Sequence, residues 1–188
     1  MVVRLVSFFI LFTLASTTQA ELLRIGLGSD MIRINYDSAN LGKSLGQVEL
    51  EAGFLYSEQN PTSDTMGHLG ALVRGESVEA PVIVAVGIRA YFGSADGYSV
   101  GGLAIGGDVA LAPESWNGFG LSGIFYLAPS VVSYGDAKGI QDYGVAATFK
   151  ITSQATVNLG YQVMNVDLKD LPTRKVDDGV YIGVDLTF

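Results

Sequence analysis

The chain has 188 residues, a formal net charge of −8 and no cysteine. The missing cysteine excludes a disulfide framework, a thiolate metal site and a cysteine nucleophile, and a single histidine is too few for a His/Cys metal cluster, so we expect no cofactor. The acidic balance argues against a nucleic-acid partner, which needs a basic surface.

The first 20 residues have the layout of a secretory signal peptide. Arg4 precedes an uncharged apolar run at 5–15, and the small and polar residues 16–20 end at Ala20. The apolar run is too short for a spanning helix, so we expect cleavage after Ala20 and export. The alternative is an uncleaved membrane anchor, although no stop-transfer pattern follows it. Residues 21–188 are then one mature domain.

Apolar and polar residues alternate with a period of two throughout the mature region, between clusters of Gly, Asp, Asn and Pro. No segment there approaches the ~20 uninterrupted apolar residues of a membrane helix. A chain this apolar without such a helix can cross lipid only as a closed sheet, because lipid offers no partners to backbone N–H and C=O groups. Ten candidate strands fit this pattern: 22–28, 31–37, 46–57, 66–74, 81–93, 98–111, 119–132, 140–152, 155–168 and 178–188.

The sequence therefore predicts an all-β fold, an antiparallel transmembrane outer-membrane β-barrel. The first two segments are short and could instead form one irregular strand. Bacterial single-chain barrels have even strand counts, so we expect about ten strands, with eight as the alternative.

The alternation assigns an outward face to each strand. A soluble β-sandwich or lipocalin-like barrel that uses this same face as its core is the alternative. The clearest outward positions are Val48, Leu50, Ala52, Phe54, Tyr56, Val82, Val84, Val86, Ile88, Ala90, Phe92, Tyr143, Val145, Ala147, Phe149, Ile151, Val157, Leu159, Tyr161 and Val163.

The opposite, inward face carries charges of both signs in equal number. An unpaired charge in a narrow protein-lined lumen is costly, so these charges predict a network of ion pairs. If Ser57 lies opposite Met66 in the hairpin, Glu49 pairs with Arg74. Counting from the two chain ends places Arg24 of the first strand opposite Asp185 of the last. The predicted network is Arg24, Arg33, Glu49, Glu51, Arg74, Arg89, Asp108, Asp142, Lys150 and Asp185.

Two roles are open for this network. We favour ion pairs that brace the wall, because barrels of about eight strands are largely filled by side chains. A charged constriction that selects solutes is the alternative, supported by small inward residues such as Gly102, Gly106 and Gly144. If the inward charges cancel, the acidic excess lies in loops such as 58–64 and 167–178.

The only histidine, His68, falls at a position of the predicted strand 66–74 that faces the barrel interior. It raises the alternative of a lipid or peptide hydrolase. No sequence around it resembles the motifs of outer-membrane hydrolases. The G-x-S-x-G match at 97–101 follows a hairpin turn and lacks the strand–turn–helix context of a nucleophile elbow. We therefore expect no enzyme activity. Surface adhesion or ligand binding through the acidic loop 167–178 is a further alternative.

The last strand ends on an aromatic residue and resembles the signal that the barrel-assembly machinery reads. The residues that carry this likeness are Tyr181, Gly183, Leu186 and Phe188. The segments VNLGYQVMNVDLKD and DDGVYIGVDLTF, with ELLRIGLGSD after the signal peptide, resemble the YfaZ family of Gram-negative outer-membrane proteins. That resemblance implies a porin-like barrel, and it brings no active site.

Together these patterns predict a porin-like barrel in the cell outer membrane. We expect it to give passive passage to small solutes or to be a structural component of the wall. The expected partners are outer-membrane lipids, lipopolysaccharide and the assembly machinery, and nothing in the sequence calls for an oligomer.

Overall fold

The computed structural model describes residues 21–38, 47–58, 62–77 and 81–188. The predicted signal peptide lies outside these residues, and its cleavage stays a prediction. The strands are β1 (Leu22–Gly28), β2 (Met31–Asp37), β3 (Gln47–Ser57), β4 (Asp64–Glu76), β5 (Val82–Ala95), β6 (Tyr98–Leu111), β7 (Phe119–Ala128), β8 (Ser133–Gly135), β9 (Ala137–Lys150), β10 (Ala155–Leu168) and β11 (Arg174–Thr187). The helical turns are η1 (Glu114–Trp116) and η2 (Ser130–Val132). Within the described ranges, no helix is long and apolar enough to cross a membrane.

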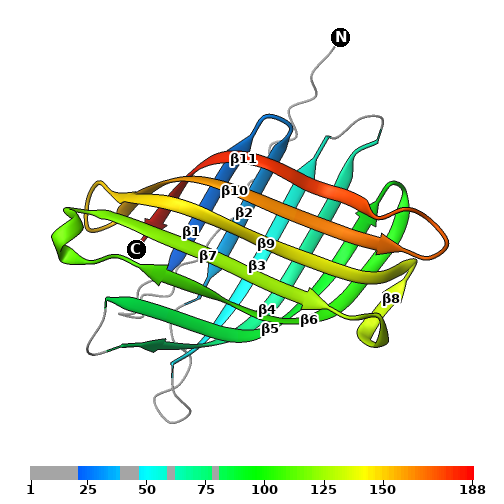
Figure 1. Ribbon diagram of the computed structural model, residues 1–188, viewed down its shortest axis with the longest axis horizontal. Helices are drawn as coiled ribbons and strands as arrows, with labels where there is room; N and C mark the ends of the chain where they lie inside the picture. The colour runs from blue at the N-terminus through cyan, green and yellow to red at the C-terminus, as the bar shows by residue number, and fades with distance from the viewer. Residues whose placement is uncertain (1–20, 39–46, 59–61, 78–80) are drawn as a thin grey trace.

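The strands close into a barrel. The sheet runs in the order β5, β4, β3, β2, β1, β11, β10, β9, β7 and β6, and β5 also pairs with β6, which joins the two edges. The short β8 pairs with β6 beyond the end of β7. It therefore continues the wall in the place of β7 and does not count as an eleventh strand. In Figure 1, β7, β9, β10 and β11 form the front wall, and β1 to β4 cross behind them at a different tilt. The wall therefore has ten strands, as predicted, and the alternative of eight is wrong.

All ten predicted strands are present, and four of them match in both bounds. The segments 22–28, 31–37, 98–111 and 155–168 match β1, β2, β6 and β10 to the residue. The first two segments are separate strands that pair antiparallel, with Leu22 opposite Asp37, so the alternative of one irregular strand is wrong.

Strands β9 and β11 start three and four residues earlier than predicted, and two further details of the prediction are wrong. The seventh strand stops at Ala128 because Pro129, which has no N–H to donate, follows it and leads into η2. The β3–β4 register pairs Ser57 with Asp64 and not with Met66. Strand β4 starts two residues earlier than predicted, where the Asp64 carboxylate accepts a hydrogen bond from the backbone N–H of Asp96 at 2.7 Å.

The outside of the barrel is apolar and exposed. The exposed fraction is 58% for Val86, 67% for Val145 and 59% for Leu159. A soluble barrel or sandwich would bury this face, so that alternative is wrong. Val163 is the exception among the predicted outward positions, with 6% exposure, and it lies beside a register shift between β10 and β11.

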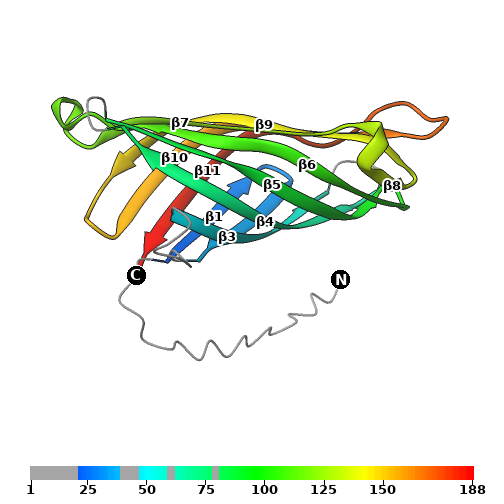
Figure 2. The same ribbon diagram turned by 90° about the horizontal axis from the view of Figure 1, so that it is seen from below.

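The two ends of the barrel differ. At the end here called the terminal end, the backbones of Glu21 and Phe188 are joined by N–H to O bonds of 2.9 and 3.1 Å. The other end, here called the opposite end, carries β8 and the β10–β11 loop, and Figure 2 shows β8 far from the C terminus. Apolar side chains fill the half of the interior near the opposite end: Met31, Leu55, Met66, Tyr91, Val100, Ile140, Met164, Val166 and Val176.

Candidate functional site

A layer of buried charges crosses the middle of the barrel. At its centre is Asp142 of β9, whose side chain is completely buried. Its carboxylate lies 3.6 Å from an Arg33 nitrogen and 3.8 Å from an Arg89 nitrogen, so it joins β2 to β5 across the interior. It also accepts hydrogen bonds from the Tyr91 hydroxyl at 2.9 Å and from Gln162 Nε2 at 2.7 Å. Four donors therefore surround one buried carboxylate, which offsets much of its desolvation cost.

Arg89 links this central layer to β3 and β6. Its guanidinium forms two hydrogen bonds with Glu51, one of them at 2.7 Å, and such a two-point pair fixes the orientation of both groups. The Arg89 Cζ atom lies 3.6 Å from the centre of the Tyr126 ring, which adds a cation–π contact. An Asp108 oxygen is 3.7 Å from Arg89 and accepts a hydrogen bond from the Tyr126 hydroxyl at 3.1 Å.

Each of the remaining arginines in the described part of the chain also has a carboxylate of its own. Arg24 of β1 pairs with Asp37 of β2. Arg74 Nε donates to both oxygens of Glu49 at 2.8 and 2.9 Å. In the central layer Arg33 donates to Asp177 at 3.0 Å.

The fifth pair lies at the opposite end. Arg174 Nε donates to Asp64 at 2.8 Å, and an Arg174 terminal nitrogen donates to Thr62 at 3.2 Å. Asp64 is completely buried. This pair ties the β10–β11 end of the barrel to the start of β4.

The structure places nine of the ten predicted network residues on the inner wall. Lys150 is the exception, because it is exposed at the end of β9. Arg24 lies opposite Asp185 in the β1–β11 register, as counted, but its guanidinium bonds to Asp37. The pair Arg74 and Glu49 forms as predicted although the register is shifted by two residues, because Arg74 lies opposite Gln47 and reaches Glu49 diagonally.

Sequence reasoning missed four charges of the interior, namely Asp37, Asp64, Asp177 and Arg174. Asp37 was detectable, because it continues the inward phase of Arg33 within a predicted strand. Asp64 and Asp177 fall on the right phase but just before the predicted starts of their strands. The balance of the predicted network is therefore wrong: five arginines face eight carboxylates among the described inner residues.

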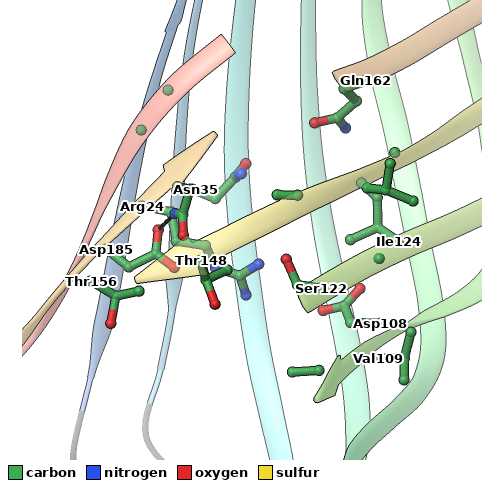
Figure 3. A pocket seen from close by; sticks show the side chains of 18 of the residues that line it. Arg24, Asn35, Asp108, Val109, Ser122, Ile124, Thr148, Thr156, Gln162 and Asp185 are labelled. Carbon is green, nitrogen blue, oxygen red and sulfur yellow. Dashed lines mark hydrogen bonds between the residues drawn. The ribbon is translucent and has the colours of Figure 1, made fainter. Parts of the chain in front are cut away.

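A cavity of about 260 Å³ lies between the central layer and the terminal end. Arg33, His68 and Arg89 line its inner end, and Leu22 and Leu111 line it near the terminal end. Figure 3 shows polar side chains entering it from both sides. Those with labels are Arg24, Asn35, Asp185, Thr156 and Thr148 on one side, Ser122 and Asp108 on the other, and Gln162 above them in this view.

His68 lies on the inner wall of β4 but lacks the partner that a hydrolase needs. The residue is 7% exposed, and its ring packs against Tyr91 with ring centres 5.5 Å apart. Its Nε2 atom has no hydrogen-bond partner, so no serine hydroxyl is held against that nitrogen. Glycine at 53 leaves room for the ring, because a β-carbon there would lie 2.2 Å from His68 Cε1. The geometry gives the hydrolase hypothesis no support.

The residues of the predicted assembly signal occupy both faces of β11. Leu186 and Phe188 are on the outside, with exposed fractions of 37% and 50%. Tyr181 and Gly183 line the cavity. Recognition of this strand by the assembly machinery stays a prediction.

Ten antiparallel strands closed into a barrel, with an apolar exterior and an ion-paired interior, define an antiparallel β-barrel of the transmembrane class. The family model described as YfaZ precursor matches residues 3–188, so the chain belongs to the YfaZ family. The resemblance seen in the sequence is thereby confirmed.

Comparison with solved structures finds a distant likeness. The crystal structure of the outer membrane channel DcaP of Acinetobacter baumannii is 11% identical, with a TM-score of 0.44 over 92% of this chain and 60% of that one. The present chain therefore spans less than two thirds of the DcaP chain. No curated protein matches this sequence.

Proposed function

We propose that this protein is a barrel of the Gram-negative outer membrane, exported by a cleavable signal peptide, with both termini in the periplasm. Membership of the YfaZ family supports this, together with the exposed apolar exterior. Eight of the ten wall strands have 10 to 14 residues, about the length that a tilted strand needs to cross a bilayer. The outer face then contacts lipid and lipopolysaccharide, the assembly machinery reads the last strand, and the barrel acts as a monomer.

We further propose that the barrel is a wall component closed to free diffusion in this conformation. The observation that carries this is the completely buried Asp142 at mid-barrel, held by Arg33, Arg89, Tyr91 and Gln162. Apolar side chains fill the interior behind it, toward the opposite end, and the cavity lies on the terminal side of the layer. Passive passage of small solutes is the second candidate, and it requires this layer to move.

Membrane location is tested by fractionating cells that make the protein and by comparing gel migration of heated and unheated samples. We expect the protein in the outer-membrane fraction, with unheated barrel migrating differently from heated chain. Recovery in the soluble periplasm with a single band would contradict the proposal.

Closure is tested by single-channel recording in planar bilayers. We expect wild-type protein to give no steady open-channel current. Tyr91→Ala removes a completely buried side chain whose hydroxyl donates to Asp142, and we expect discrete current steps from this variant. The matched control is Tyr143→Ala on the outer face, where 38% of the residue is exposed, and it should stay silent. Steady wild-type current would instead support passive passage.

A further inference from the structure

We propose that a hollow on the outer wall of the barrel binds the phosphorylated sugar headgroup of lipopolysaccharide, with Lys138 as its phosphate contact. The hollow lies at the opposite end and is separate from the cavity described above. This site rests on the proposed outer-membrane location, because only there does the opposite end face the outer leaflet.

The hollow lies between two loops of the opposite end. Its volume is about 410 Å³, within the roughly 300–1,000 Å³ of known ligand pockets. The end of β7 and the start of η2 form one side, the β10–β11 loop forms the other, and β9 and β10 form the floor. Figure 1 shows both loops at the same end of the barrel. The polar side chains of the lining are Ser130, Lys138, Gln141, Asp167 and Thr173.

The hollow begins where the outer face changes from apolar to polar. The β7–β9 register pairs Phe125 with Tyr143, and both side chains are exposed on the outside. Two residues further toward the opposite end the register pairs Leu127 with Gln141, and both residues line the hollow. Tyrosine is typical of the boundary between hydrocarbon and headgroups. In the proposed membrane location, the hollow is therefore at the depth of lipid headgroups.

A β-bulge turns Lys138 to the outside. The β9–β10 register shifts between Asp167 and Leu168, which leaves Lys138 of β9 as an extra residue. Ala137 before it is 1% exposed and belongs to the core, whereas Lys138 is exposed and lines the hollow. Strict alternation from the buried Asp142 would place Lys138 inside the barrel, so the bulge reverses its direction. Bulges often occur where a side chain is re-aimed next to a functional site.

The charge of Lys138 is available to a ligand. Lys175 pairs with Asp178 at 2.5 Å, whereas Lys138 forms no ion pair with a described residue. The carboxylate in the lining, Asp167, accepts a hydrogen bond from the Thr173 hydroxyl at 2.6 Å. An ammonium group donates to phosphate oxygens, while carboxylate, amide and hydroxyl groups bond to the hydroxyls of a sugar. Because both kinds of group line one hollow, a phosphorylated sugar suits it better than phosphate alone.

Apolar side chains beside the hollow indicate that the sugar belongs to a lipid. Val131 of η2 is 87% exposed, Leu171 of the β10–β11 loop is 42% exposed, and Leu127 at the edge of the hollow is 41% exposed. A free sugar phosphate would leave these side chains in water. The acyl chains of lipopolysaccharide would cover apolar surface next to the headgroup, which is favourable.

The test is native mass spectrometry of the folded, detergent-solubilised barrel with lipid A, the diphosphorylated diglucosamine lipid that anchors lipopolysaccharide. Phosphatidylglycerol is the comparison, an anionic lipid without a sugar ring. We expect saturable binding of lipid A and about tenfold weaker binding of phosphatidylglycerol. Lys138→Glu should weaken lipid A binding by about tenfold or more, because it replaces attraction to phosphate by repulsion.

A second variant tests the shape of the hollow. A β-carbon on Gly139 would lie 3.3 Å from Asp167 Oδ2 and 3.5 Å from the Ala128 carbonyl oxygen, so a side chain there fills the floor. We expect Gly139→Leu to weaken lipid A binding by about tenfold as well. Lys150→Glu is the matched control, because Lys150 is exposed on the same strand at the terminal end. It should bind lipid A like wild type.

Heat-modifiable migration checks that each variant is a folded barrel. It also separates this site from the proposed location: a heat-modifiable barrel in the outer-membrane fraction that binds no lipid A would overturn the site alone. The site is equally overturned if phosphatidylglycerol binds as tightly as lipid A. It is overturned too if folded Lys138→Glu or Gly139→Leu binds lipid A as tightly as Lys150→Glu does.

Discussion

Asp142 is the residue that the central layer depends on most. Removing its carboxylate leaves Arg33 with only Asp177 and Arg89 with Glu51 and Asp108, and it leaves the Tyr91 hydroxyl and Gln162 Nε2 without their buried acceptor. Breaking one side of a buried ion pair costs about 3–5 kcal/mol. We expect Asp142→Ala to lower the free energy of unfolding by that amount, measured by urea titration followed by circular dichroism. The exposed control Asp136→Ala should stay within about 0.5 kcal/mol of wild type. Equal effects of the two variants would mean that Asp142 does not hold the layer.

For single residues, the sequence predicted which face of a strand carries charge better than it predicted which charged side chains form ion pairs. Strict period two brought Arg24, Arg89 and Asp142 to the inner wall, because successive strand residues point to opposite faces. The partner of Arg24 is Asp37 on β2, although Asp185 lies directly opposite on β11. Partner choice depends on the stagger of the closed barrel and on side-chain reach, and no local pattern contains either.

Among the elements, the loops of the opposite end are held together by Arg174. Its guanidinium bonds to Asp64 and Thr62, while Asp64 also accepts from the backbone N–H of Asp96 in the β5–β6 turn. We expect Arg174→Ala to increase amide hydrogen exchange in residues 62–77 and 91–98 severalfold, with little change at the terminal end. Lys175→Ala is the neighbouring control, since that side chain is 63% exposed. Similar exchange in both variants would contradict this role for Arg174.

The last strand carries a second prediction at this scale. Phe188 completes the seam by pairing its backbone with Glu21, and its ring is half exposed on the outer face. We expect deletion of Phe188 to reduce outer-membrane insertion in cells strongly, measured by fractionation. Protein refolded directly into detergent should still form a barrel, because the seam keeps the seven β1–β11 pairs from Leu22 to Gly28. Normal insertion of the shortened chain would show that this residue is not part of an assembly signal.

Element bounds were predictable wherever alternation is unbroken, and the failures have local causes. The register shift between β10 and β11 pairs Met164 with Asp177 and Asn165 with Lys175, which leaves Val176 as an extra residue. That bulge reverses the phase beyond it, so Arg174 points inward although simple alternation assigns it outward. Nothing in a strict period of two indicates where such an insertion occurs.

The molecule as a whole is distinguished by an exterior more apolar than its interior. One substitution tests whether this exterior is surrounded by water or by lipid. Val145 lies near the middle of β9 with 67% exposure. In water, Val145→Arg at such an exposed position should change the free energy of unfolding by less than about 0.5 kcal/mol. In a bilayer, an arginine on the lipid face near the midplane costs about 2–4 kcal/mol. We expect the larger cost in urea titrations of the barrel in lipid vesicles, and only a small cost for Ser130→Arg in the exposed turn η2. Equal small costs at both positions would mean that the apolar exterior does not face lipid.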